Sequence, residues 1–209
     1  MNTSGGYLID PGRLVDITMP LGAETPCYPG DTPFSREVIR QDGFVSSRLS
    51  LSSHSGTHID PPAHLAGGGR TVDMLPPERL ILPALLIDCR GKRSIGPGLL
   101  DGLDFSNKAL LFRTGAPRGL TAEMPGMERE AAIDALEGGA ALVGTDAISI
   151  DPPGSVECHH LLLPASVPIL ENLLLDGVDA GEYLLICFPL RLEHCDGSPV
   201  RAFLQVMGT

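Results

Sequence analysis

Residues 53–64 read Ser53-His54-Ser55-Gly56-Thr57-His58-Ile59-Asp60-Pro61-Pro62-Ala63-His64, and they contain three of the six histidines of the chain. The three histidines and Asp60 all occupy even-numbered positions. In an extended backbone, side chains at such positions share one face. A helix would also align His54 with His58, but Gly56 and the Pro61-Pro62 pair disfavour a helix here. The segment therefore predicts an extended stretch with its imidazoles and one carboxylate on the same face.

These four side chains suit a divalent metal ion. Positions four apart on a straight strand are separated by about 13 Å, whereas positions two apart are separated by roughly 6.6 Å. A turn or bulge is therefore required between His54 and His58, and Gly56 is where the backbone could make it. Imidazole nitrogens and carboxylate oxygens bind Zn²⁺, Mn²⁺ and other first-row ions, and a site without thiolates is typical of catalysis. The alternative is a set of unrelated surface or core histidines, but the density of candidate ligands favours metal.

Short apolar runs bounded by Gly, Pro or Asp predict a protein built mainly from strands. The expected strands cover residues 14–17, 44–52, 82–89, 109–113, 140–144, 183–189 and 200–206. Residues 44–52 alternate apolar and polar side chains, as a half-buried strand does, and lead directly into the histidine segment. Helices are expected over 127–137, where Gly138-Gly139 would end the helix, and from about Pro168 through Leu173. The expected fold class is mixed α/β with a predominantly β core, in a single domain over residues 1–209.

Composition excludes several classes of function. The 209 residues include 15 Lys and Arg against 26 Asp and Glu, so the formal charge is −11, which disfavours binding to nucleic acid or to an anionic membrane surface. The longest apolar run, Leu80 to Cys89, is interrupted by Pro83 and is too short to span a bilayer. Five scattered cysteines without a CxxC spacing argue against disulfides and zinc–thiolate sites, and favour a reducing cytoplasm.

A second group of candidate residues lies further along the chain. Cys158-His159-His160 offers two more imidazoles, and Glu171 follows His159 by twelve residues. A carboxylate in the otherwise apolar stretch 167–173 must be paired, coordinated or turned outward, and that stretch alone favours a helix glutamate that faces water. Asp146 ends an apolar strand and could either orient a metal-bound histidine or cap a loop.

Over nearly its whole length the sequence resembles the cyclase family of metal-dependent hydrolases, which includes bacterial kynurenine formamidases (arylformamidases). The histidine segment carries the resemblance most specifically. Further motifs appear in the family order: Asp16-Ile17 with Pro20-Leu21, Tyr28-Pro29-Gly30-Asp31-Thr32-Pro33, Arg113-Thr114-Gly115, Gly144-Thr145-Asp146 with Ser149 and Asp151, His159 with Glu171, and Ser198-Pro199-Val200-Arg201.

The resemblance implies roles for individual residues. It points to His54, His58 and Asp60 as metal ligands and to His159 and Glu171 as ligands for a second ion. Asp60 would bridge the two positions, and His64 matches the catalytic histidine rather than a ligand. Asp146 stays a candidate for orienting a ligand from outside the coordination sphere, and Tyr28 a candidate for contact with the substrate.

The resemblance also implies a swivelling β/β/α fold, homodimers or larger homo-oligomers, and a divalent ion, Zn²⁺ or alternatively Mn²⁺. The implied reaction is hydrolysis of a linear amide, N-formylkynurenine, to kynurenine and formate in tryptophan degradation. Related members open the ring of isatin, and Thr57 and Tyr28 stand where kynurenine formamidases often carry other residues. A cyclic amide or an ester is therefore an alternative substrate, and a non-catalytic metal-binding protein is a more remote alternative.

Overall fold

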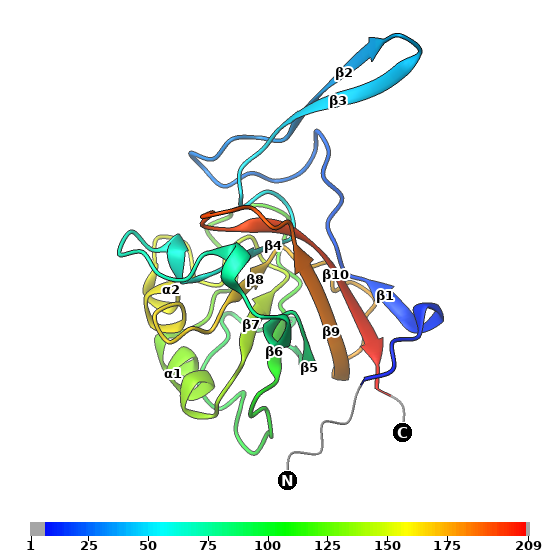
Figure 1. Cartoon of the computed structure of the whole chain (residues 1–209). Coiled ribbons are helices and arrows are strands. Elements are labelled where there is room, and N and C mark those ends of the chain that lie inside the picture. Colours follow the sequence, from blue (N-terminus) through cyan, green and yellow to red (C-terminus); the bar gives the residue numbers. More distant parts are fainter. Residues whose placement is uncertain (1–6, 208–209) are drawn as a thin grey trace.

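The computed structural model describes residues 7–207, in which strands predominate and the helices are short (Figure 1). The two α-helices are α1 (Arg129–Glu137) and α2 (Glu157–Leu162). The strands are β1 (Leu14–Asp16), β2 (Ser35–Gln41), β3 (Phe44–Ser50), β4 (His58–Asp60), β5 (Ile81–Asp88), β6 (Ala109–Arg113), β7 (Leu142–Thr145), β8 (Ile169–Glu171), β9 (Gly181–Pro189) and β10 (Ser198–Val206). Short 3₁₀ turns occupy Pro11–Arg13, Pro62–His64, Val72–Met74 and Pro77–Arg79.

The main sheet closes on itself. Its strand order is β1-β10-β4-β8-β7-β6-β5-β9, and an additional pairing joins β9 to β10. Strands β5, β6, β7 and β8 run parallel to their neighbours in this series, whereas β4, β9 and β10 pair antiparallel. Seven strands therefore form a barrel-like sheet, and β1 extends it at the far end of β10.

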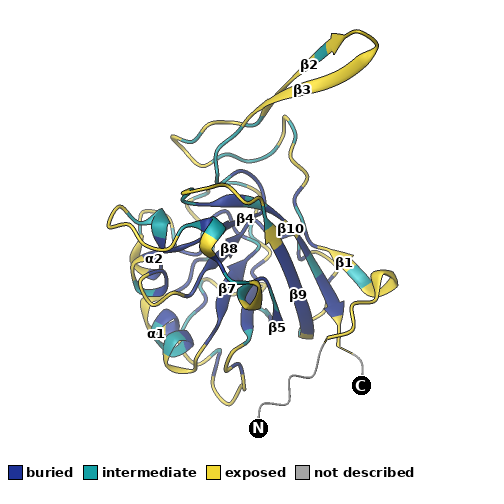
Figure 2. Ribbon diagram, viewed as in Figure 1, coloured by how far each residue is buried: buried dark blue, intermediate teal, exposed yellow. Residues whose placement is uncertain are grey.

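Two apolar cores lie on opposite sides of this sheet, because side chains alternate along each strand. In the fully buried strand β6, Ala109 and Leu111 belong to the core inside the barrel. Leu110 and Phe112 belong to the outer core, which α1 and α2 cover. On β4, Ile59 faces the inner core, so His58 and Asp60 face the side on which α2 lies. Figure 2 shows the buried sheet enclosed by more exposed loops.

Most of the predicted elements are present. The expected mixed α/β class with a β core is confirmed, the seven expected strands correspond to β1, β3, β5, β6, β7, β9 and β10, and α1 ends at the predicted Gly138. The helix expected from Pro168 is wrong, because Ile169–Glu171 form β8, which pairs parallel with β7 and antiparallel with β4. The sequence-based prediction also missed β2 and the short helix α2, whereas β4 lies within the stretch that was expected to be extended.

The expectation of a half-buried strand over 44–52 is also wrong. Strand β3 pairs only with β2, and every residue of β3 is exposed. The two strands form a hairpin that extends away from the barrel (Figure 1). Among residues 7–207, no helix is long and apolar enough to cross a bilayer.

Candidate metal centre

Strand β4 presents the first two candidate ligands on one face. His58 and Asp60 are two residues apart on this strand, and His58 lies opposite Glu171 of β8 in the antiparallel register. Nε2 of His58 is 3.5 Å from Oδ1 of Asp60 and 3.6 Å from Oε2 of Glu171. All three residues are buried. The strand pairing thus brings together residues that are more than a hundred positions apart in the sequence.

Gly56 makes the turn that the spacing of the histidines requires. Its φ is +62°, in the left-handed region that favours glycine, and a Cβ there would lie 2.7 Å from Cδ2 of Leu21. The turn returns His54 toward the strand, where its Nδ1 is 2.8 Å from Oδ1 of Asp60. The Gly56 carbonyl also accepts a hydrogen bond from Nδ1 of His58 at 2.8 Å. A neutral His58 ring therefore carries its proton on Nδ1 and has Nε2 free to bind a metal.

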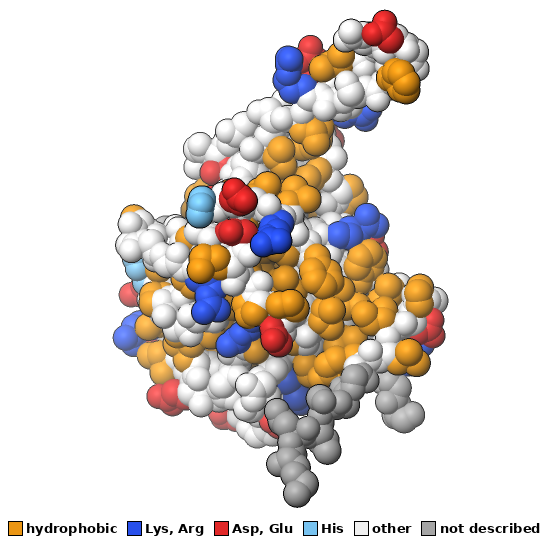
Figure 3. Space-filling model, viewed as in Figure 1, with side chains coloured by type: hydrophobic (Ala, Val, Ile, Leu, Met, Phe, Trp, Pro, Cys, Tyr) orange, Lys and Arg blue, Asp and Glu red, His pale blue; other side chains and the backbone are white. Residues whose placement is uncertain are grey.

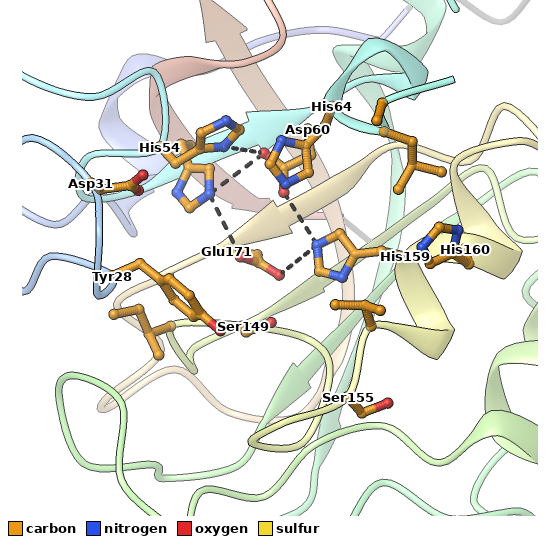
Figure 4. Close-up of a pocket in the computed structure, with 15 residues that line it drawn as sticks. Tyr28, Asp31, His54, Asp60, His64, Ser149, Ser155, His159, His160 and Glu171 are labelled. Carbon is orange, nitrogen blue, oxygen red and sulfur yellow. Dashed lines mark hydrogen bonds and ion pairs between the residues drawn. The ribbon is translucent and has the colours of Figure 1, made fainter. Parts of the chain in front are cut away.

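Helix α2 supplies His159 from the other side of the centre (Figure 4). Nε2 of His159 lies 3.7 Å from Oδ2 of Asp60 and 3.6 Å from Oε1 of Glu171. Its Nδ1 lies 2.6 Å from Oδ2 of Asp151, which also accepts a hydrogen bond from the backbone N–H of His159 at 3.1 Å. Asp151 therefore fixes the orientation of the ring and directs Nε2 toward the two carboxylates.

The spacing of these donors fits a divalent ion better than direct hydrogen bonds. The four distances between the Nε2 atoms and the carboxylate oxygens, 3.5 to 3.7 Å, exceed the range of N–H···O bonds. Two ligands that each lie about 2.1 Å from a tetrahedral ion are about 3.4 Å apart. Oδ2 of Asp60 is buried and has no hydrogen-bond partner, which is costly for a carboxylate unless a cation is present. Nitrogen and oxygen donors in this arrangement fit a first-row divalent ion.

The electrostatics of the cluster point in the same direction. Burial opposes ionisation of Asp60, but the neighbouring histidines outweigh it and hold the pKa of this carboxyl well below its usual value. Burial raises the pKa of Glu171 to about 8, and the negative charge of Asp60 adds to that effect. Two buried carboxylates this close need positive charge if both are to be ionised. A divalent cation held by these residues would supply that charge.

His64 lies beside the cluster rather than within its closest contacts. It ends the 3₁₀ turn that follows β4, and its ring centroid is 4.2 Å from that of His54 and 5.7 Å from that of His159. Its Nδ1 is buried without a hydrogen-bond partner and lies 3.8 Å from Oδ2 of Asp196. Burial lowers the pKa of His64, so the ring is neutral near pH 7 and can accept a proton.

Asp196 is a residue of the cluster that the sequence did not reveal. Its Oδ2 is 3.0 Å from Nε2 of His54, and its Oδ1 accepts a hydrogen bond from the Ser53 hydroxyl at 3.0 Å. Both nitrogens of His54 thus face carboxylates, which raises its pKa to about 9 despite burial. The next residue, Gly197, packs against this ring, because a Cβ there would lie 2.7 Å from Cε1 of His54. The only local hint in the sequence is an Asp-Gly pair before the Ser198-Pro199 motif.

The structure places Asp146 outside this cluster. Its carboxylate accepts hydrogen bonds from the backbone N–H groups of Thr114 and Gly115, at 2.8 and 2.9 Å, and the described residues give it none from a histidine. Asp146 therefore caps a loop, which was one of its two expected roles. The other role, orienting a candidate metal-binding histidine, belongs to Asp151. The prediction that Glu171 faces water, which its own segment favoured, is also wrong, since only 4% of this residue is exposed.

The cluster forms the floor of a cavity of about 360 Å³, a size suited to a small molecule. Tyr28 and Asp31 line it from the loop before β2, as Figure 4 shows. Ser149, Ser155 and the exposed ring of His160 line it as well, and Ser149 lies beside Tyr28 in Figure 4. No Lys or Arg is among the lining residues of the described chain. Three overlapping groups have ligand atoms within 4.8 Å of one another: His54–His58–Asp60, Asp60–His64–His159 and His54–His64–Asp196.

A histidine–carboxylate centre of this kind, at the base of a small-molecule cavity, is typical of metal-dependent hydrolases. Comparison with known proteins agrees with this class. The model of the Cyclase family matches residues 15–152, and the chain belongs to the cyclase family. It is 38% identical over 203 residues to a kynurenine formamidase of Bacillus anthracis, covering 92% of this chain and 97% of that protein. It is also 38% identical over 201 residues to a kynurenine formamidase of Bacillus mycoides, covering 91% of this chain and 96% of that protein.

Solved structures share the fold. A structure described as a predicted metal-dependent hydrolase from Bacillus stearothermophilus has a TM-score of 0.80 and 28% sequence identity, with 91% of this chain and 97% of that chain covered. Isatin hydrolase A from Labrenzia aggregata, solved with benzyl benzoate bound, has a TM-score of 0.82 and 25% identity, with 94% of each chain covered. The fold expected from the family resemblance is therefore confirmed.

Proposed function

We propose that this chain is a metal-dependent amidohydrolase that converts N-formylkynurenine to kynurenine and formate. The buried carboxylate pair Asp60 and Glu171, facing Nε2 of His58 and His159, is the observation that supports it most strongly. The kynurenine formamidases that match over more than nine-tenths of the chain support the choice of substrate.

The family resemblance assigns the donors to two metal positions. His54, His58 and Asp60 would hold one ion, and His159 and Glu171 would hold a second, with Asp60 close to the ligands of both. Zn²⁺ fits this nitrogen and oxygen set, and Mn²⁺ is the alternative. When bound, such an ion acidifies water and polarises a carbonyl group.

His64 would carry the proton in this reaction. Expelling an aniline nitrogen requires protonation of the leaving group, and a neutral histidine beside the cluster can take a proton from water and return it to that nitrogen. Its unpartnered Nδ1 and lowered pKa suit this role. Tyr28, from the loop before β2, is placed to contact the aryl part of the substrate. We place this reaction in a single catalytic domain in the cytoplasm, which agrees with five free cysteines.

Parallel assays with N-formylkynurenine, isatin and a simple aryl ester test the proposed substrate. We expect turnover of the formamide to exceed that of the other two at least 100-fold in kcat/KM. Preferential opening of isatin would instead support the cyclic-amide alternative, which the fold shared with isatin hydrolase A motivates.

Replacement of single histidines tests the roles. We expect His64→Asn to keep bound metal while kcat falls by a factor of about 10² to 10⁴. His58→Asn should lose both metal and activity, because its Nε2 faces both carboxylates. His194→Asn is the matched control, since this exposed histidine lies outside both the cluster and the cavity lining. If His64→Asn lost metal as readily as His58→Asn, their separate roles would be wrong.

A further inference from the structure

The turn between β9 and β10, residues 190–197, carries Asp196, a residue outside the two proposed metal positions. Figure 3 shows hydrophobic side chains gathered over β9 and β10, whereas acidic side chains and a histidine gather at the turn. The Asp196 side chain is 49% exposed, and it is not among the described residues that line the cavity. Any effect of Asp196 on the cavity must therefore pass through the side chains that it contacts.

Hydrogen bonds from a neighbouring loop hold the backbone of this turn. The N–H of Val72 donates to the carbonyl of Cys195 at 3.0 Å, and the N–H of His194 donates to Oδ1 of Asp73 at 3.1 Å. His194 has a φ of +57°, in the left-handed region that is unusual for a residue with a side chain. Such a conformation persists where the surrounding contacts over-determine the backbone, and it is common at functional sites. The turn is therefore a fixed support for Asp196.

The side chain of Asp196 is held as well. The Ser53 hydroxyl donates to its Oδ1 at 3.0 Å, which leaves Oδ2 to the imidazole rings. This Oδ2 lies 3.0 Å from Nε2 of His54 and 3.8 Å from Nδ1 of His64. The two rings lie close together in Figure 4, with their centroids 4.2 Å apart. One oxygen atom of Asp196 thus faces both histidines.

This shared oxygen selects the tautomer of each ring, because a carboxylate accepts hydrogen bonds and cannot donate them. A His54 ring that donates from Nε2 has Nδ1, which lies 2.8 Å from Oδ1 of Asp60, free to bind a metal ion. The distance of 3.8 Å to His64 exceeds the hydrogen-bond range, and a shift of roughly 1 Å would close it. A His64 ring that donates from Nδ1 has Nε2 free to accept a proton at the cavity, which His64 lines.

We infer that Asp196 is a positioning residue that orients both the metal ligand His54 and the proton carrier His64 through one oxygen atom. The role toward His64 rests on the proposed hydrolysis, whereas the role toward His54 concerns metal binding alone. Asp151 orients His159 in the same way, but it serves a single ring. Because two rings share the Asp196 carboxylate, the proton carrier is placed relative to the metal centre rather than independently of it.

A metal titration against a competing chelator tests the role toward His54 without any substrate. Asp196→Ala should weaken the binding of Zn²⁺ about 10- to 100-fold, because the ring of His54 loses the carboxylate that fixes its orientation. Glu193→Ala is the matched control, since it removes an exposed carboxylate from the same turn. The control variant should bind Zn²⁺ as tightly as the unaltered chain.

A double-mutant cycle tests the role toward His64. With metal at saturation, Asp196→Ala should lower kcat for N-formylkynurenine at least about 10-fold and change KM by less than about 3-fold, since Asp196 does not contact the substrate. In the His64→Asn background the same replacement should lower kcat by less than about 3-fold, because the ring that it positions is already gone. A residue that merely supported the turn would cost the same factor in both backgrounds.

A second variant covers the case in which circular dichroism shows that Asp196→Ala does not fold. Ser53→Ala removes only the hydroxyl that holds Oδ1 of Asp196, and it should produce both effects in weaker form. Unchanged Zn²⁺ affinity in a folded variant would overturn the role toward His54, and an equal loss of kcat in both backgrounds would overturn the role toward His64. If the unaltered chain opened isatin and left N-formylkynurenine intact, the proposed substrate would be wrong, and the same cycle measured with isatin would decide the role of Asp196.

Discussion

Removal of the metal should lower the stability of the whole fold, because the proposed ligands come together only in the folded chain. His58 and Asp60 lie on β4, His159 on α2 and Glu171 on β8. An unfolded chain cannot hold these groups in place as metal ligands. Essentially all of the binding free energy therefore adds to the stability of the folded state.

The size of this effect follows from mass action. At a free metal concentration about 100 times the dissociation constant, binding adds about 2.7 kcal/mol to the free energy of unfolding. For a chain of 209 residues, each 1 kcal/mol corresponds to about 2–4 °C in the melting temperature. The melting temperature should therefore rise by about 5–11 °C when chelator-treated protein is refilled.

Differential scanning calorimetry on chelated and refilled protein, with metal content measured on the same samples, provides the assay. Asp60→Asn should reduce the shift to less than about 2 °C, because the bridging carboxylate with its unpartnered Oδ2 is lost. Asp146→Asn makes the same chemical change outside the cluster and should keep the full shift. A shift that was absent in the unaltered protein, or equal in Asp60→Asn, would refute this account of the centre.

Three further outcomes are expected. Gly197→Ala should displace the His54 ring, because the new Cβ would lie 2.7 Å from Cε1 of that ring. Activity should fall at least 10-fold while the circular dichroism spectrum stays unchanged, and full activity would contradict this packing. Asp151→Asn should weaken metal binding about 10- to 100-fold in a titration, because His159 loses the carboxylate that orients it, and an unchanged affinity would contradict that role. A thiol reagent at pH 8 should label at most two of the five cysteines in native protein and all five in denaturant, because burial raises the pKa of the thiols of Cys89, Cys158 and Cys187.

The residues nearest one another in the sequence were the most predictable part of the site. His58 and Asp60 share a face because of strand alternation alone, and the turn expected at Gly56 is present with φ of +62°. These relations depend only on the local backbone.

Long-range contacts set the limit of prediction. The segment around Glu171 was predicted as a helix, because the periodicity of a short apolar run does not distinguish a buried strand from a helix, and pairing with β4 and β7 makes it β8. The contact between His54 and Asp196 spans 142 positions, and no local pattern encodes it. The choice of Asp151 over Asp146 depends on how the loop before α2 turns, which likewise follows from tertiary packing. Residues 44–52 were predicted to form a half-buried strand because alternation does not show whether a strand has a sheet to join.

Hydrolysis of N-formylkynurenine by protein of known metal content tests the central proposal most directly. Metal-free protein should be inactive, and activity should rise in proportion to added Zn²⁺ or Mn²⁺ until one or two ions are bound per chain. Formate and kynurenine should form in equal amounts. Turnover that survived complete removal of metal would contradict the proposed function.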